Sequence, residues 1–183
     1  MPDDDTVLAR AGSGVGHLTL NRPRAINALD LRMIESLSAA LDRWRDDPSV
    51  DVVLLDGAGE RGLCAGGDVR GLHAQISAGD PAATGRFFRA EYRLNLAIAT
   101  YPKQFVVLAD GITMGGGIGL AGHAAVRVVT ERSRLAMPET RIGLTPDVGG
   151  SWLLARAPGR VGEYLALTGA TMDAADAIYA GFA

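Results

Sequence analysis

Apolar side chains recur along this 183-residue chain at two different spacings, and the spacings predict where strands and helices form. Short apolar runs predict strands at 6–11, 15–20, 50–56, 104–109, 126–130 and 135–137. The first two runs flank Gly12, Ser13 and Gly14, where backbone freedom permits a hairpin. The run at 50–56 is almost continuously apolar, which is typical of a buried parallel strand.

The stretches between these runs predict helices. Asp30 is a favourable N-cap for a helix that continues to about Asp46. Apolar residues recur along it every three or four positions: Leu31, Ile34, Leu37, Leu41 and Trp44. A second long helix is expected from Asp80 to Thr100, with Glu91 outside its apolar stripe and therefore at the surface. Shorter helices are expected at 151–156, 160–168 and 173–180. The alternation of helices and strands predicts an α/β fold.

Two glycine-rich segments follow predicted strands. Residues 57–71 contain six glycines, which let backbone N–H groups approach a ligand closely, although a surface loop without a ligand would have the same composition. Residues 115–117 are three consecutive glycines at the start of a predicted helix. Free amides at such a position are suited to stabilising negative charge.

Two carboxylates lie in the Pro- and Gly-rich segment MPETRIGLTPDVGG at 137–150. Glu139 follows Pro138 and Asp147 follows Pro146, so the backbone before each acid is restricted. This placement favours acid–base chemistry. The alternative interpretation is that both acids are helix-start carboxylates that accept backbone N–H bonds.

The composition is that of an ordinary globular protein. Hydrophobic residues make up 48% and charged residues 21% of the chain, so a substantial core is expected. The net charge is −3 and no basic run is present, which argues against a nucleic-acid partner. No apolar stretch of about 18 residues is present to span a membrane, and MPDDDTVLAR lacks the pattern of a signal peptide. A cytoplasmic location is therefore expected.

Cysteine and histidine are scarce. Cys64 is the only cysteine, which excludes an internal disulfide and suits a reducing compartment. No histidine lies at a motif position to activate it, so a packing role is expected. His73 and His123 are expected to be structural as well. No metal-ligand spacing is present, and neither a metal nor a prosthetic group is expected.

Four motifs occur along the chain in order: NRPRAINAL (21–29), CAGGD (64–68), DGITMGGGIGL (110–120) and AMPETRIGLTPDVGG (136–150). In this order and spacing they resemble the crotonase superfamily of acyl-CoA enzymes. The resemblance implies repeated ββα units, in two nearly perpendicular sheets surrounded by helices. It also implies an acyl-CoA substrate, with coenzyme A as part of that substrate, and assembly as a homo-oligomer, commonly of trimers.

The same resemblance implies roles for particular residues. The backbone N–H groups of Gly67 and Gly116 would form an oxyanion hole for the thioester carbonyl, which becomes an enolate or a tetrahedral oxyanion. Arg22 or Arg24 would lie near the phosphates of coenzyme A. The residues implied to bind coenzyme A are Arg24, Ala25, Ala65, Gly66 and Asp68.

The pattern of acids distinguishes between reactions of the superfamily. Enoyl-CoA hydratases carry a glutamate where this sequence has Gly119, so the usual two-glutamate hydration is not expected. The pair Glu139 and Asp147, together with FFRAEYRLN (87–95), is similar to the 3-hydroxyisobutyryl-CoA hydrolase family of valine breakdown. That resemblance implies that Glu91 contacts the substrate. Glu139 would be the nucleophile or the base for water, and Asp147 would orient the hydroxyacyl group or the water.

Two other interpretations stay open. An enoyl-CoA hydratase- or isomerase-type enzyme would use Glu139 alone, and a non-catalytic acyl-CoA-binding or assembly subunit would use no acid. The second is motivated by length, because relatives in the superfamily are longer, and Phe182 and Ala183 look like the start of a further strand. Residues 1–183 are therefore expected to be a crotonase-like core domain without its C-terminal helical lid and trimerisation region. Such a chain is expected to have little activity alone, and to associate with copies of itself or with a polypeptide that carries the remaining part.

Overall fold

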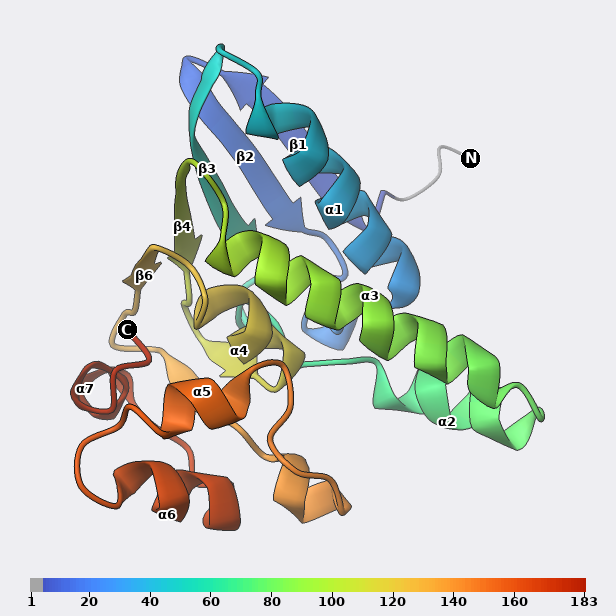
Figure 1. The fold of residues 1–183 in the computed structure, drawn as a ribbon, viewed down its shortest axis with the longest axis vertical. Helices are drawn as coiled ribbons and strands as arrows, with labels where there is room; N and C mark the ends of the chain where they lie inside the picture. The colour runs from blue at the N-terminus through green and yellow to red at the C-terminus, as the bar shows by residue number, and fades with distance from the viewer. Residues whose placement is uncertain (1–4) are drawn as a thin grey trace.

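The computed structural model describes residues 5–183 and contains two β-sheets surrounded by helices (Figure 1). Residues 1–4, on which part of the signal-peptide expectation rests, lie outside the described residues. The larger sheet has the strand order β1-β2-β3-β4-β6. These strands are β1 (Val7–Gly12), β2 (Gly14–Leu20), β3 (Val50–Gly57), β4 (Gln104–Leu108) and β6 (Val126–Val128).

The larger sheet is antiparallel only at its β1 edge. β1 pairs with β2 in antiparallel orientation, and β2, β3, β4 and β6 pair in parallel. Ser13 and Gly14 join β1 to β2 with φ of 52° and 81°, the left-handed backbone that a tight hairpin requires. The predicted hairpin and the predicted buried strand at 50–56 are both confirmed.

The smaller sheet pairs β5 (Ile112–Met114) with β7 (Arg134–Ala136) in parallel. The apolar pattern does not predict β5, because its three residues stand within a segment of loop composition. Gly111 and Gly115 flank it with φ of 64° and 49°, which glycine adopts without a steric penalty. The chain therefore turns sharply out of β5 and delivers three glycines to the start of the next helix.

Two long helices, α1 (Leu31–Arg45) and α3 (Pro81–Ala99), lie side by side over one face of the larger sheet (Figure 1). Asp30 caps α1 by accepting a hydrogen bond from the Met33 backbone N–H at 2.8 Å, and Asp80 caps α3 in the same way. The first core forms between these helices and the sheet. Its buried residues include Leu18, Leu20, Ile34, Leu37, Leu41, Trp44, Val53, Leu55, Phe87, Leu94, Ile98, Phe105 and Val107.

The remaining helices are short. They are η1 (Pro23–Ala25), α2 (Val69–Ser77), α4 (Gly116–Ala121), η2 (Glu139–Ile142), α5 (Gly150–Leu154), α6 (Val161–Thr168) and α7 (Ala174–Tyr179). Among them, α2 packs against α3. A second core lies among α4, β7 and the C-terminal helices. It includes Ile118, Leu135, Met137, Val148, Leu153, Leu165, Met172 and Phe182.

Phe182 and Ala183 do not begin a strand, so that expectation is wrong. Both backbone N–H groups donate to the Ala177 carbonyl, at 2.8 and 3.2 Å, which closes a turn after α7. The Phe182 ring is buried in the second core, so its apolar character reflects packing of a helix end. The predicted α/β class is confirmed, and α4 stands at the centre of the molecule where the two cores meet (Figure 1).

Candidate active site

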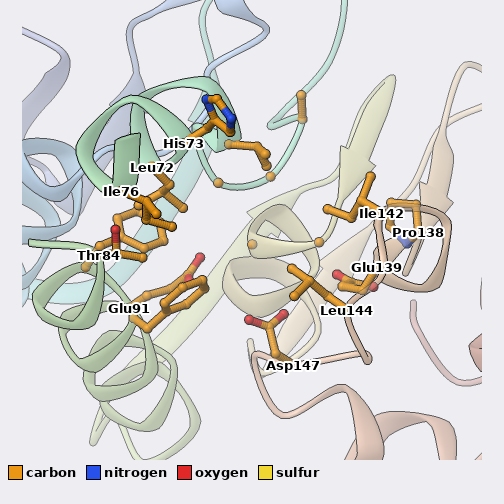
Figure 2. A pocket seen from close by; sticks show the side chains of 18 residues that line it. Leu72, His73, Ile76, Thr84, Glu91, Pro138, Glu139, Ile142, Leu144 and Asp147 are labelled. Carbon is orange, nitrogen blue, oxygen red and sulfur yellow. The ribbon is translucent and has the colours of Figure 1, made fainter. Parts of the chain in front are cut away.

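A pocket of about 340 Å³ lies among α2, α3, the start of α4 and the segment from 138 to 147 (Figure 2). The residues predicted to bind or react with the acyl group all line it: Gly67, Glu91, Gly116, Glu139 and Asp147. Most of its remaining wall is apolar: Val69, Leu72, Ile76, Phe87, Phe88, Ile142 and Leu144. Polar groups converging in an apolar cleft of this size are typical of a small-molecule site.

The backbone N–H groups of Gly67 and Gly116 are adjacent and donate to no acceptor among residues 5–183. A Cβ on Gly116 would lie 3.3 Å from the Gly67 nitrogen and would collide with Glu91 Oε1. Only glycine therefore fits at position 116. Two free amides at one point form the geometry that an oxyanion hole requires.

Both amides are held by neighbouring hydrogen bonds. Leu29 N–H donates to the Gly66 carbonyl and Asp68 N–H donates to the Leu29 carbonyl, both at 2.8 Å, so the peptide between them is fixed. Gly115 N–H donates to the Ala136 carbonyl at 3.1 Å, which fixes the start of α4. Donors that are fixed before reaction need no reorganisation as charge develops.

Glu139 begins the 3-10 helix η2 with its carboxyl inside the pocket. Glu139 is only 5% exposed, and its Oε2 atom has no hydrogen-bond partner among the described residues. Oε1 lies against Gly115, where a Cβ would be 3.1 Å away. Burial raises the pKa of Glu139 to about 7, and the negative charge of Asp147 adds to the shift. A carboxyl with such a pKa can act as a base near neutral pH.

Asp147 approaches the pocket from the loop before α5, and Tyr92 on α3 holds it. The Tyr92 hydroxyl donates a hydrogen bond to Asp147 Oδ2 at 2.8 Å. Burial, followed by this hydrogen bond, raises the pKa of the Tyr92 phenol, so it stays a donor. The N-cap of α5 is Gly149 and has no side-chain cap, so the alternative of a helix-start carboxylate is wrong for Asp147. For Glu139 that alternative holds in part, because the residue does start η2.

Glu91 is buried in the pocket wall, so the expectation of a surface position is wrong. Only 2% of the residue is exposed, and its side chain points from α3 toward the wall that carries Glu139 and Asp147 (Figure 2). Burial, with Asp147 and then Glu139 adding to it, raises the pKa of Glu91 to about 8. Its position agrees with the substrate contact that the resemblance implies.

The position of Gly119 on α4 is closed to a larger side chain. A Cβ there would lie 2.8 Å from Asn95 Nδ2 and 2.8 Å from the Val148 Cβ. Asn95 is 4% exposed, and neither amide atom has a hydrogen-bond partner among the described residues. α4 therefore offers no second acid to Glu139, and two other elements occupy the space.

The residues predicted to bind coenzyme A separate into two groups. Ala65 and Gly66 line the pocket, whereas Arg24 and Ala25 are exposed outside it on η1. Asp68 also lies outside, because its side chain caps α2 by accepting the Gly71 N–H at 3.1 Å. These roles stay predictions.

Arg22 has a structural role, so it is not free to bind phosphate as expected. Its guanidinium contacts Asp68 at 3.0 Å and Asp30 at 3.3 Å, and donates to the Ala28 carbonyl at 2.5 Å. These contacts tie the loop before α1 to the start of α2. Arg24, which is exposed, is the remaining candidate of the two arginines.

The structure places the two histidines and Cys64 in different surroundings. His73 is exposed on the pocket wall, and its structural role stays a prediction. His123 is structural, with Nε2 2.7 Å from the Val148 carbonyl. Cys64 is fully buried, and burial raises the pKa of its thiol to about 12, which agrees with packing.

Within residues 5–183, no group of His, Cys, Asp or Glu side chains has the arrangement of a metal site. None of the helices in that range combines the length and apolar content needed to cross a membrane.

Residues 15–183 match the family model described as enoyl-CoA hydratase/isomerase, and the chain belongs to this family. It is 50% identical over 181 residues to the mitochondrial 3-hydroxyisobutyryl-CoA hydrolase of Xenopus tropicalis, which covers 99% of this chain and 46% of that protein. It is 45% identical over 183 residues to 3-hydroxyisobutyryl-CoA hydrolase 1 of Arabidopsis thaliana, with 100% and 48% covered. The chain thus spans about half the length of the curated relatives it matches.

Solved structures confirm the fold. A carnitinyl-CoA dehydratase from Mycobacterium thermoresistibile is 54% identical with a TM-score of 0.95, covering 98% of this chain and 52% of that one. An enoyl-CoA hydratase from Rhodobacter sphaeroides 2.4.1 is 52% identical with a TM-score of 0.95, covering 98% and 53%. The predicted crotonase resemblance is confirmed, although the names of the relatives describe three different reactions.

Proposed function

We propose that this protein hydrolyses a short acyl-CoA thioester, with 3-hydroxyisobutyryl-CoA as the leading substrate. The observation that carries the proposal is the pocket itself: two free amides share it with Glu139 and Asp147, and Gly119 contributes no second acid beside Glu139. The curated relatives from frog and plant, both named 3-hydroxyisobutyryl-CoA hydrolase, support the choice of substrate.

The reaction begins with the thioester oxygen accepting hydrogen bonds from the N–H groups of Gly67 and Gly116. Either Glu139 attacks the carbonyl carbon and forms an anhydride, or it takes a proton from a water that attacks. In both routes the new C–O bond forms as the C=O electrons move onto oxygen. The C–S bond then breaks and coenzyme A leaves as thiolate. Asp147, held by Tyr92, orients the hydroxyacyl group or the water.

The bound substrate would extend from this pocket toward η1. The acyl group fits the apolar wall of α2 and α3, and the thioester lies at the two amides. Coenzyme A would then pass Ala65 and Gly66 and reach the exposed Arg24 and Ala25. Asp68 would act here through its backbone, since its side chain is engaged with Arg22.

Thiol release tests the proposal directly. The purified protein is mixed with 3-hydroxyisobutyryl-CoA, with an unsubstituted short acyl-CoA and with an enoyl-CoA, and free thiol is followed with a chromogenic reagent. Release that is fastest with the 3-hydroxyacyl thioester is expected. Release no faster than in the protein-free control for every thioester would refute hydrolysis by this chain.

Label in the Glu139 side chain after a single turnover in oxygen-18 water would identify the covalent route. If Glu139 attacks, hydrolysis of the anhydride at the enzyme acyl carbon leaves label in the Glu139 side chain, which peptide mass spectrometry detects. If water attacks directly, all label appears in the released acid. The Glu139→Gln variant, treated in the same way, gives the background level of label.

A hydratase-type reaction is the second candidate, because the two solved structures above carry the names of a dehydratase and a hydratase. In this case Glu139 alone would move the proton. Loss of the conjugated double bond of an enoyl-CoA, followed by its ultraviolet absorbance without thiol release, would favour this candidate.

We also propose that the chain associates through its C-terminal helices. Large apolar side chains that are more than half exposed gather on α5, α6 and α7: Trp152, Tyr164, Leu167, Ile178 and Tyr179. Exposed apolar surface of this kind favours burial against a partner. Light scattering after size exclusion tests this proposal, and a monodisperse monomer at all concentrations would refute it.

A cytoplasmic location stays a prediction.

A further inference from the structure

Glu91 places a carboxyl oxygen close to the start of α4, where the two free amides meet. Its Oε1 atom is buried and would collide with a Cβ on Gly116, and that Cβ position is itself 3.3 Å from the Gly67 nitrogen. Oε1 therefore lies next to Gly116, on the side of that residue that faces Gly67. Whatever charge Glu91 carries acts on the atom that becomes negative during the reaction.

No positively charged group compensates Glu91. Within residues 5–183, Oε1 has no hydrogen-bond partner, and no salt bridge includes this carboxyl. The titratable groups near it are Glu139 on η2, Asp147 before α5, His73 on α2 and the buried Cys64 thiol, with the adjacent Tyr92 phenol donating to Asp147. Glu139 and Asp147 are acids, so they oppose ionisation of Glu91.

The rest of the wall near Glu91 is apolar. Phe87 is buried, with its ring edge 3.2 Å from the position of a Cβ on Gly67, and Phe88 packs against Phe87 with ring centroids 5.3 Å apart. An unpaired charge in such surroundings is costly, and the group takes the neutral form instead.

The chemistry of the site agrees with a neutral Glu91. A carboxylate at this point would repel the charge that develops on the thioester oxygen, and it would compete with that oxygen for both amides. A neutral carboxylic acid has an O–H donor and keeps an acceptor oxygen. A neutral Glu91 can therefore supply a third hydrogen-bond donor beside the two backbone amides.

We propose that Glu91, as a neutral carboxylic acid, donates a third hydrogen bond to the thioester oxygen alongside the N–H groups of Gly67 and Gly116. This inference rests on the proposed thioester hydrolysis and assigns a new role within it. Glu91 keeps its proton throughout, because the electrons of the C=O bond move onto oxygen and return when the C–S bond breaks. Its carbonyl oxygen stays available to a 3-hydroxyl group of the substrate.

The sign of the pH dependence follows from this role. A donor must be protonated, so turnover falls as pH rises through the pKa of Glu91. A carboxylate that accepts a hydrogen bond from the substrate would give the opposite sign, with turnover rising over the same range. Glu139 gives the opposite sign, because it is active when deprotonated, so the Glu91→Gln variant is needed to assign the loss at high pH to Glu91.

Two substitutions test the role by thiol release across pH. Glu91→Gln keeps an N–H donor that does not titrate, so we expect turnover within about tenfold of the unmodified protein at pH 7 and no loss at high pH. Glu91→Leu has similar volume and no donor, so a loss of about 100- to 1,000-fold is expected. Glu35→Gln, which alters an exposed carboxyl on α1, is the matched control and should change neither the turnover at pH 7 nor its loss at high pH.

Three results would overturn the proposal. One is a Glu91→Gln variant as inactive as Glu91→Leu, because the carboxylate itself would then be required. Another is turnover of the unmodified protein that rises through the high-pH range. The third is a high-pH loss that persists unchanged in Glu91→Gln at a pH where both proteins stay folded.

Infrared spectroscopy tests protonation without turnover. The difference spectrum between the unmodified protein and Glu91→Gln at pH 7 should show the carbonyl band of one protonated carboxyl, which disappears as pH is raised. Absence of that band refutes the neutral acid. If no acyl-CoA releases thiol but the band is present, the proposed hydrolysis fails while the protonation state holds, so the two failures are distinguishable.

Discussion

The two walls of the pocket are built in different ways. One wall consists of backbone amides at Gly67 and Gly116, held by main-chain hydrogen bonds and unable to change charge. The other wall consists of the carboxyl groups of Glu139 and Asp147, carried by η2 and a loop, and Glu139 Oε1 meets the amide wall at Gly115. One of them has a shifted pKa, and the other depends on a tyrosine from a different helix.

The two walls therefore respond differently to pH. The N–H groups of the amide wall do not titrate, so they remain hydrogen-bond donors at every pH. The carboxyl wall supplies reactivity that depends on pH and on contacts between distant segments. Glu91 belongs to neither wall, since it projects from α3 across the pocket from Glu139 and Asp147 (Figure 2).

Removing the reactive carboxyl should have the largest effect. Glu139→Gln is expected to lower turnover about 1,000-fold, because the amide neither attacks nor accepts a proton. In the unmodified protein the rate should rise with pH through about 7, since the carboxyl is active when deprotonated and its pKa is raised to that value. Thiol release from pH 6 to 8 checks both. A variant with more than a tenth of the original turnover would contradict the assigned role.

Damage to the amide wall should come next. Gly116→Ala inserts a Cβ that collides with Glu91 Oε1 and crowds the Gly67 nitrogen, so we expect turnover to fall about 100- to 1,000-fold. The pH profile of the remaining activity should be determined to separate this variant from the previous one.

Gly85→Ala is the control for the alanine substitution. It adds a methyl group to α3 near the same pocket, where the nearest atom is the Arg89 guanidinium at 3.5 Å, an ordinary contact. Turnover should be unchanged. Equal losses in both glycine variants would show that the effect of Gly116→Ala is not specific to the amides.

Loosening the carboxyl wall should have a moderate effect. Tyr92→Phe removes the hydrogen bond to Asp147 and should lower turnover roughly tenfold, since a bond to a charged group contributes about 1.5 kcal/mol. Tyr101→Phe is the matched control, because that hydroxyl donates to the Leu41 carbonyl away from the pocket. Unchanged turnover in Tyr92→Phe would show that Asp147 needs no such support.

The smallest effect on turnover should come from replacing Cys64, which packs behind the amide wall. Cys64 is buried, and its sulfur accepts the Gly66 N–H at 3.4 Å. Cys64→Ala should reduce the free energy of unfolding by about 1 kcal/mol and change turnover by less than about threefold. Urea denaturation and thiol release measure the two quantities. A loss comparable to that of Gly116→Ala would mean that the thiol helps to hold the first amide.

Much of this arrangement is predictable from the sequence. Apolar spacing predicts the strands and the long helices, and glycines after strands predict the amide wall. These are local signals, since each depends on residues within one segment. The motif order 64–68, 110–120 and 136–150 also brings the amides and the two acids together in one pocket, as the resemblance implies.

The remaining features depend on contacts between segments that are far apart in the sequence. Tyr92 and Asp147 are separated by 55 residues, so helical periodicity shows only an aromatic on α3. Glu91 is buried on the same face of α3 as Phe87, Leu94 and Ile98. The prediction of a surface position is wrong because it placed the apolar stripe on a different face, where Tyr92 and Leu96 are exposed. Arg22 is paired because the start of α2 returns to the loop before α1.

The closed position at Gly119 links three parts of the chain into one steric unit. Asn95 on α3 and Val148 beside Asp147 both reach the space that a side chain on α4 would need. A larger residue at 119 therefore demands smaller or displaced residues at 95 and 148 at the same time. Among family members these three positions should vary together, and a single substitution at 119 should be tolerated less well than a compensated triple change.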